Sequence, residues 1–318
     1  MSQLKPLYYK NGPIRSLATL AESLKLTCPQ LLKLAENSNS MYFYRPQEKK
    51  DGSLRDTWDA HPQLKSVHEL LNKRFLKKID YPNYLQGGIR HRDYVRNVSI
   101  HSGAKCAIAL DVADFFPSIT ETQVYDIWHK FFRFSEEVSK VLTKLTTYKG
   151  ILPQGAKTSS YLANLVLWRE ESNFVFKLQS LGWGYSRLID DITISKKNVP
   201  KSNEVSHICG MGIHFIESQG FKLKRSKLVI LRQEQQMKLN GILANVRPAL
   251  MKAERNKIRG QVKWLSRSID LKTPILSKQL HSTIGKLEKL RRFHPREASK
   301  LRETLPNKIE QSANLIEA

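Results

Sequence analysis

Three aspartates stand where the chain could bind metal ions. Asp111 ends an apolar segment, and Asp190 and Asp191 are adjacent between two runs rich in β-branched residues. Carboxylate oxygens suit Mg²⁺, and two such ions roughly 3.5–4 Å apart can activate an attacking hydroxyl and stabilise a leaving pyrophosphate. The set therefore suggests two-metal phosphoryl transfer. The competing interpretation of Asp190-Asp191 is a polar turn between two strands.

A second segment with chemical potential is the loop Leu152-Pro153-Gln154-Gly155, followed by a polar stretch at residues 156–160. Gly155 allows the backbone to approach a ligand closely. Residues 156–160 are expected to open a helix whose N-terminus favours an anion such as phosphate. An ordinary loop and helix cap would have the same residues. The segment therefore adds to the phosphoryl-transfer interpretation of the aspartates but does not establish it by itself.

Hydrophobic periodicity predicts the elements that position these residues. Strands are expected at residues 105–111, 183–189 and 192–196. Adjacent side chains point to opposite faces of a strand, but a tight turn can direct both Asp190 and Asp191 toward one metal cluster.

The other segments read mainly as helices, with a hairpin at residues 41–58 that turns at Asp51-Gly52. Further strands are expected at 221–231 and 236–244. Helices are expected at 14–37 (two, divided near Thr27-Cys28-Pro29), 62–78, 121–131, 134–148 and 203–219, with one long helix from the 150–155 loop to about Leu181.

The balance of charge points to a polyanionic partner. The 318 residues include 53 Lys and Arg against 29 Asp and Glu, a net charge of +24. The 40% hydrophobic content supports a packed core, and the basic excess favours nucleic acid over an anionic membrane surface. We expect no membrane span and no secretory signal, and the three scattered cysteines do not have the spacing of a disulfide framework or a zinc site. We expect a cytoplasmic protein without a membrane partner.

The composition shifts near residue 250. Residues 251–300 hold 14 Lys and Arg against 4 Asp and Glu, a net charge of +10. Apolar residues at helical spacing predict two or three helices there. We expect a separate basic helical region, beginning near Val246-Arg247-Pro248, that contacts phosphate groups. A solvated helix face would show the same pattern.

The order and spacing of these segments resemble reverse transcriptases from about residue 41 to 245. The shared features are Asp111 followed by Phe115-Phe116, then Leu152-Pro153-Gln154-Gly155, then Asp190-Asp191. The resemblance implies an α+β right-hand polymerase fold with fingers, a palm with an antiparallel sheet, and a helical thumb. The expected divisions are an N-terminal helical segment (1–40), fingers and palm (41–246) and a basic helical thumb or RNA-binding region (247–318).

The resemblance also assigns the metal site. Asp111, Asp190 and Asp191 match the catalytic, metal-binding carboxylates, and Val112 is placed with them among the metal contacts. Leu188 departs from the family, which usually has Tyr two residues before the aspartate pair. Metal binding should survive this change, whereas primer geometry, fidelity or processivity is the property expected to differ.

Four further positions are expected at the incoming nucleotide. Phe116 matches the aromatic gate that rejects a ribose 2′-OH, and Gln154 matches the loop glutamine that contacts the nucleotide. Arg55 matches the fingers arginine near the triphosphate. Lys227 matches a palm lysine downstream of the aspartate pair.

The segment Asn97-Val98-Ser99-Ile100-His101 narrows the resemblance to retron reverse transcriptases. It is similar to their Asn-Ala-x-x-His element, with Val98 in place of Ala, and the compact length also fits. Asn97 and His101 are expected either to contact RNA or order an RNA-binding loop, or to serve as buried polar caps.

Two basic clusters in the C-terminal region are further candidates for RNA contact. The candidates are Lys252, Arg255, Arg259, Lys263, Trp264, Arg291 and Arg292. Trp264 could stack on an unpaired base or pack in the core between helices. Shape and unpaired bases are the expected targets, because side chains cannot read the narrow major groove of A-form RNA.

For a retron enzyme, the resemblance implies deoxynucleotide addition with two Mg²⁺ ions. A structured non-coding RNA would provide template and primer, and the product would be a branched RNA–DNA hybrid (msDNA). It also implies anti-phage defence in which the enzyme and its product restrain an accessory effector protein. The alternatives are another bacterial reverse transcriptase (diversity-generating, abortive-infection or intron-derived) and a non-catalytic RNA-binding scaffold on a polymerase fold.

Overall fold

The computed structural model describes residues 7–49, 52–267 and 274–305. The chain divides into two compact units. The first unit lies within Met1–His101 and Lys105–Arg232, and the second within Ser102–Ala104 and Gln233–Ala318. The boundary expected from composition, at residues 246/247, falls inside the second unit. Backbone hydrogen bonds between Leu243 and Ala249 explain this, because they join the segment before that position to the segment after it.

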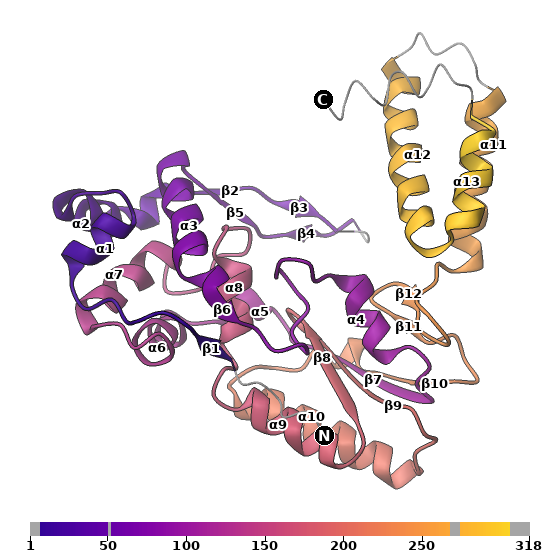
Figure 1. Ribbon diagram of the computed structural model, residues 1–318, viewed down its shortest axis with the longest axis horizontal. Helices are drawn as coiled ribbons and strands as arrows, with labels where there is room; N and C mark the ends of the chain where they lie inside the picture. The colour runs from indigo at the N-terminus through magenta and orange to yellow at the C-terminus, as the bar shows by residue number, and fades with distance from the viewer. Residues whose placement is uncertain (1–6, 50–51, 268–273, 306–318) are drawn as a thin grey trace. The chain divides into compact units, whose positions relative to one another are not determined.

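Four antiparallel strands form the central sheet of the first unit, in the order β10-β7-β9-β8 (Figure 1). They are β7 (Cys106–Asp111), β8 (Gly184–Leu188), β9 (Asp191–Lys196) and β10 (Val229–Arg232). The strands predicted at 105–111, 183–189 and 192–196 are confirmed to within one residue. The strand predicted at 221–231 is shorter, because the 3₁₀ turn η4 (Arg225–Lys227) interrupts it.

Helices cover both faces of this sheet. Helices α9 (Glu171–Ser180) and α10 (Ser202–Ser218) lie along one face (Figure 1). There Phe174 packs edge-on against Tyr185 at a ring separation of 5.8 Å, and Gly212 leaves room for Leu110. Helix α4 (Tyr94–His101) lies against the other face, where His101 bonds to both strands of the β8–β9 hairpin. The sheet is therefore a rigid platform with the aspartates at one end.

The remaining strands of the first unit form three short antiparallel pairs. They are β1 (Tyr8–Tyr9) with β6 (Ile79–Asp80), β2 (Tyr42–Tyr44) with β5 (Trp58–Ala60), and β3 (Gln47–Glu48) with β4 (Leu54–Arg55). The last two pairs make the ribbon predicted at residues 41–58 (Figure 1). Gly52 has the positive φ, 81°, that a tight turn requires, whereas Lys50 and Asp51 lie outside the described residues.

The other helices of the first unit are α1 (Leu17–Ser23), α2 (Cys28–Glu36), α3 (Pro62–Arg74), α5 (Phe115–Ser118), α6 (Glu121–Asp126), α7 (Glu136–Thr146) and α8 (Ser159–Leu165). Most of them were predicted, but α5 was not, and α8 is only the first part of the long helix expected to end near Leu181. The division between α1 and α2 is confirmed, because Thr27 and Gln30 form a capping box at the start of α2. The helix predicted at 121–131 changes to a π-helical turn at Ile127–Phe131.

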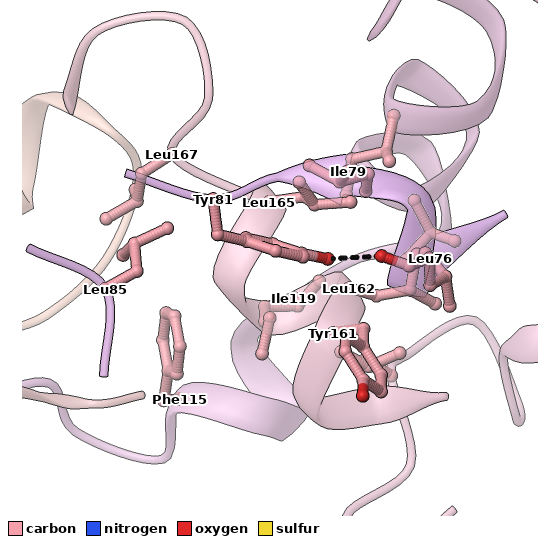
Figure 2. Packing of buried hydrophobic residues seen from close by; sticks show 14 of the residues in the cluster. Leu76, Ile79, Tyr81, Leu85, Phe115, Ile119, Tyr161, Leu162, Leu165 and Leu167 are labelled. Atoms are coloured by element: carbon pink, nitrogen blue, oxygen red, sulfur yellow. Dashed lines mark hydrogen bonds between the residues drawn. The ribbon is translucent and has the colours of Figure 1, made fainter. Parts of the chain in front are cut away.

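Apolar side chains from several of these elements form one core. Figure 2 shows part of it, where Leu162 and Leu165 of α8 pack near Leu76 and Tyr81. The Tyr81 hydroxyl donates to the carbonyl of Leu76 at 3.1 Å, so this buried phenol has a partner. Each fully buried leucine contributes about 1.5–3 kcal/mol.

The prediction of one long helix ending near Leu181 is wrong. Helix α8 stops at Leu165 and α9 begins at Glu171. The interruption has a specific cause: the guanidinium of Arg187 donates to the carbonyls of Ala163 and Asn164 at the end of α8. A side-chain cation thus satisfies carbonyls that a continuous helix would pair internally.

In the described residues of the second unit, the elements are a small hairpin and three helices. These are β11 (Lys238–Leu239), β12 (Ile242–Leu243), α11 (Lys252–Arg267), α12 (Pro274–Phe293) and α13 (Pro295–Glu303). Ile258, Val262 and Leu265 are buried along one side of α11, which confirms the predicted helical spacing. Among the helices of the described part of the chain, none combines the length and hydrophobicity needed to cross a bilayer.

Candidate active site

Asp111 and Asp191 are directly opposite each other in neighbouring strands. They are the last residue of β7 and the first of β9, and they are register partners. Opposite residues of an antiparallel pair have their side chains on the same face. Asp190 precedes Asp191 in the turn of the β8–β9 hairpin. The fold therefore brings the three predicted carboxylates together at one end of the two central strands.

The turn that carries Asp190 has an unusual backbone. Leu188 and Asp191 are register partners, so Ile189 and Asp190 form a two-residue turn. Ile189 has φ of 62°, in the left-handed region that a β-branched residue rarely enters. The Val112 N–H donates to the Asp190 carbonyl at 3.1 Å and fixes the turn to the strand beside it. Strained backbone of this kind occurs at sites that must hold a fixed geometry.

Burial and mutual repulsion perturb the pKa of both turn aspartates. Burial raises the pKa of Asp190, and the charge of Asp111 adds to the rise, while Lys227 and Arg55 oppose it. Burial, with Asp190 and a hydrogen bond to Asp111, raises the pKa of Asp191 to about 7. Carboxylates pressed together in this way lack a sufficient countercharge. A bound cation would supply it.

Lys227 provides part of that countercharge. Its Nζ lies 2.5 Å from Oδ2 of Asp111, which is 4% exposed. The hydrogen bond to Asp111 raises the pKa of Lys227. The structure thus places Lys227 beside Asp111, whose carboxylate is its partner. Its contact with a nucleotide stays a prediction.

The other predicted nucleotide contacts are placed as follows. Arg55 is exposed on β4, and its positive charge lowers the pKa of Asp190. Phe116 is half-buried in α5, just beyond Asp111 in the chain. The Gln154 carbonyl accepts from the Trp58 N–H at 2.7 Å, which anchors the loop to β5. Gly155, with φ of 111°, packs closely against the backbone of Trp58.

The donor set fits Mg²⁺. Within the described ranges, no group of three or more His, Cys, Asp or Glu side chains is arranged to hold a metal ion. Mg²⁺ is usually bound by one or two carboxylates together with substrate phosphates and water. Asp111 and Asp191, with Asp190 beside them, offer such an open arrangement. Val112 has a buried apolar side chain, so its predicted metal contact could involve only its main chain.

Asn97 and His101 are buried and hydrogen-bonded. Nδ1 of His101 pairs with Ser195 Oγ at 2.7 Å and Nε2 with Ser186 Oγ at 2.6 Å. The Ser186 hydroxyl donates to Asn97 Oδ1 at 2.7 Å. Both Asn97 and His101 are 0% exposed, so neither side chain is accessible to RNA in this structure. The network fixes α4 to the hairpin, which fits the polar-cap expectation, while the ordering of an RNA-binding loop remains a prediction.

The predicted RNA contacts of the second unit lie on α11 and α12. Arg255 and Arg259 pair with Glu297 at 2.6 and 2.5 Å. Arg291 pairs with Glu288 at 2.7 Å. Trp264 is 48% exposed, which excludes the core interpretation and leaves the ring accessible for stacking. Lys252, Lys263 and Arg292 are exposed as well. Contact of this surface with RNA remains a prediction.

Two residues at the site were not predicted from the sequence. Arg187 and Glu171 form a fully buried ion pair behind the catalytic turn. One signal was present: an arginine two residues before the turn stands in an otherwise uncharged strand, Gly184–Leu188. A charge in a buried strand requires a partner, but periodicity alone does not identify which residue provides it.

Comparison with known proteins identifies the family of this chain. The model of the family described as reverse transcriptase (RNA-dependent DNA polymerase) matches residues 47–244. The chain is 33% identical to the retron Se72 reverse transcriptase of Salmonella heidelberg, over 70% of this chain and 59% of that protein. It is 29% identical to the retron Ec48 reverse transcriptase of Escherichia coli, over 92% and 76% of the two chains.

A third relative, the retron Ec86 reverse transcriptase of Escherichia coli, is 26% identical over 72% of this chain and 71% of that protein. The chain thus spans 59% of the length of the Se72 enzyme and about three quarters of the other two. The matched region contains all three aspartates and the whole central sheet. The chain therefore belongs to the reverse transcriptase family of RNA-dependent DNA polymerases, and within it the similarity is to retron reverse transcriptases.

Proposed function

We propose that this protein is a retron reverse transcriptase that copies part of a structured non-coding RNA into DNA and leaves a branched RNA–DNA hybrid. The observation that carries the catalytic part is the convergence of Asp111, Asp190 and Asp191 at one end of the central strands, where burial raises the pKa values of the turn pair. The similarity to three retron enzymes supports the retron part.

Each side chain of the site has a proposed task. Asp111, Asp190 and Asp191 would hold two Mg²⁺ ions, which when bound lower the pKa of the attacking hydroxyl and stabilise the leaving pyrophosphate. Arg55 and Lys227 would bind phosphate oxygens of the incoming nucleotide. Both are cations close enough to the aspartates to lower the pKa of Asp190, and Lys227 also lowers that of Asp191. Positioning and electrostatics carry most of the rate enhancement in phosphoryl transfer.

Two neighbouring residues would select and orient the nucleotide. Phe116 would occupy the space that a ribose 2′-OH needs. Gln154 would contact the nucleotide from a loop whose main chain is fixed to β5. The exposed basic residues of α11 and α12 would bind the phosphate backbone of the RNA, with Trp264 stacking on an unpaired base.

The test expresses the gene with its native upstream flank, purifies the protein and extracts the bound nucleic acid. Asp190→Asn is prepared in parallel, and Asp126→Asn serves as the matched control, because Asp126 pairs with Arg169 on the surface. Each extract is run on a denaturing gel untreated, with RNase and with DNase. We expect a DNA band that shifts with RNase in wild type and Asp126→Asn, and no such band in Asp190→Asn.

The other outcomes separate the remaining possibilities. DNA without attached RNA would indicate a reverse transcriptase with another priming route. RNA alone in all three preparations would contradict retron synthesis. Purified protein given an RNA template, a DNA primer and deoxynucleotides with Mg²⁺ then distinguishes an active polymerase from a silent RNA-binding scaffold.

We extend the proposal to an anti-phage role with an accessory effector. This part is supported only by the similarity to retron enzymes. It predicts that cells carrying the whole locus survive phage infection better than cells without it. Asp190→Asn should remove the protection. Equal survival of cells with and without the locus would contradict a defence role.

A further inference from the structure

Arg187 and Glu171 form an ion pair in the interior of the first unit. Both side chains are 0% exposed. Nε and Nη2 of Arg187 donate to the two carboxylate oxygens of Glu171 at 2.5 and 2.7 Å, and the Tyr185 hydroxyl donates to the same carboxylate at 2.7 Å. Desolvating two charges is costly, and apolar residues of equal volume are often as stable. Stability alone therefore does not account for this pair.

The other donors of Arg187 reach the main chain. Nη2 donates to the Asn164 carbonyl at 2.9 Å, and Nη1 to the carbonyls of Ala163 and Ile189 at 3.3 and 3.1 Å. Ala163 and Asn164 lie near the end of α8, whereas Ile189 is the strained residue of the catalytic turn. All five N–H groups of one planar guanidinium are therefore engaged, and they connect the turn to α8 and α9.

A second contact fixes the side chain of Ile189. Gly87 packs against it so closely that a Cβ on Gly87 would lie 2.4 Å from Cγ1 of Ile189. Gly87 is itself held, because Nδ2 of Asn164 donates to its carbonyl at 2.6 Å. The carbonyl of Ile189 is thus fixed by Arg187 and its side chain by Gly87, and both restraints lead back to α8.

Arg187 lies on the opposite face of the sheet from the carboxylates. It is the register partner of Ile192, whereas Asp191 is the partner of Leu188 and Asp111. Side chains alternate between faces along a strand, so Arg187 points away from the metal site. It cannot touch a nucleotide or a metal there, and it acts through the backbone of the turn.

We propose that the Glu171–Arg187 pair is a positioning device that keeps Ile189 in its left-handed conformation and so directs Asp190 and Asp191 toward Asp111. This inference rests on the proposed function for its kinetic consequences. The position of the turn itself is a structural property that can be measured without turnover.

The test must remove the bond to Ile189 without leaving a buried charge. Arg187→Met alone would leave the Glu171 carboxylate buried without its cation and would strongly destabilise the protein. The double variant Glu171→Gln/Arg187→Met removes both charges, keeps the volumes and leaves an acceptor for Tyr185. Arg169→Met is the matched control, because it removes a bidentate pair with Asp126 from a side chain that is 47% exposed.

Arg187→Lys is the second variant. It keeps a cation beside Glu171. An ammonium with three donors cannot, however, donate to the Glu171 carboxylate, the α8 carbonyls and the Ile189 carbonyl at the same time. Both variants are compared with wild type by thermal unfolding, by hydrogen exchange of the peptide covering residues 187–192, and by steady-state incorporation on an RNA template with a DNA primer. The full chain is used throughout.

We expect amides of the turn to exchange at least about tenfold faster in both variants than in the Arg169→Met control. The kcat should fall about 100-fold, because a displacement near 1 Å has that effect on a positioned group. The KM values for template–primer and nucleotide should change less than about threefold, since no substrate contact is removed.

Rescue separates positioning from a general structural role. Glycine adopts positive φ without steric cost, so Ile189→Gly should restore kcat about tenfold in the double-variant background. Wild-type exchange and kcat in folded variants would overturn the inference. A wild-type protein that incorporates no nucleotide would contradict the proposed function, and the exchange measurement would still decide the role of Arg187.

Discussion

Nζ of Lys227 lies 2.5 Å from Oδ2 of Asp111, although the two residues are 116 positions apart in the chain. The contact joins η4 to the end of β7, and it places a cation against the most enclosed of the three carboxylates. The charge of Lys227 lowers the pKa of both Asp190 and Asp191, against the larger effect of burial. The lysine therefore keeps the cluster closer to the ionised state that binds a metal.

Lys227→Gln should move the acid limb of activity to higher pH. Without this cation the pKa values of Asp190 and Asp191 rise further, so a larger fraction of the cluster is protonated near neutral pH. Incorporation should fall more at pH 6.5 than at pH 8.5. The pH–rate profile of the variant is compared with Lys222→Gln, an exposed lysine nearby in the chain. An unchanged acid limb would contradict this role.

Asp191→Asn should make the metal-free protein less sensitive to pH. The pKa of Asp191 is raised to about 7 in the folded state from an ordinary value of 3.8. Between these values the folded state binds more protons than the unfolded state, so the free energy of unfolding falls as pH rises through this window. The asparagine variant has no carboxyl group at this position, so its free energy of unfolding does not fall in this way. Above pH 7 the variant should therefore be more stable than wild type. Thermal unfolding in EDTA from pH 5 to 8 measures the difference.

His101 should have the opposite effect. Burial lowers the pKa of His101 to about 3, so the imidazole is neutral when folded and gains a proton on unfolding below its ordinary value of 6.5. Its contribution to stability is present above pH 6.5 and is lost as pH falls, by up to about 1.4 kcal/mol per pH unit. His101→Gln should be destabilised at pH 7, and the gap to wild type should narrow by pH 5. Chemical unfolding at both pH values tests this, and a constant gap would contradict it.

Gly87→Ala should impair catalysis by displacing the turn. The new Cβ would meet Cγ1 of Ile189 at 2.4 Å, and overpacking of this kind costs about 1–3 kcal/mol. Gly210→Ala is the control, because nothing lies within 4 Å of a Cβ there and the residue is inside α10. The control should gain about 0.5–1 kcal/mol in stability with normal incorporation. Equal activity of the two variants would show that the turn tolerates the displacement.

Lys263→Gln and Trp264→Ala should weaken RNA binding in different ways. A lysine that neutralises one phosphate contributes to the salt dependence of binding, so its loss should reduce the slope of log K against log salt by about 0.7–0.9. Loss of a stacked Trp264 should reduce the affinity by about 1–3 kcal/mol without changing that slope. Filter binding of the upstream RNA at several salt concentrations distinguishes the two. Wild-type affinity in both variants would remove this face from the RNA interface.

The carboxylates could be predicted because local signals agreed. The apolar runs before Asp111 and around Asp190-Asp191 have the composition of buried strands, and the structure pairs these strands in register. The helices of the second unit were equally predictable, because Ile258, Val262 and Leu265 repeat at helical spacing. In both cases the pattern within one segment contained the information.

The errors arose where one segment depends on another. The break between α8 and α9 comes from Arg187, a side chain more than 20 positions further along the chain. The burial of Asn97 and His101 is possible because two serine hydroxyls of the hairpin are their hydrogen-bond partners. Serine on a strand is usually a solvent-exposed residue, so its use as a buried partner does not follow from the strand pattern.

The closed set of bonds around Arg187 has an evolutionary consequence. Because neither charge of the Glu171–Arg187 pair is tolerated alone in the interior, a change at either position must pass through a poorly folded intermediate unless both change together. The two positions should therefore vary as a unit among descendants of this chain. Glu171, a helix residue nearly 20 positions before the catalytic turn, therefore limits which sequence changes the turn can accept.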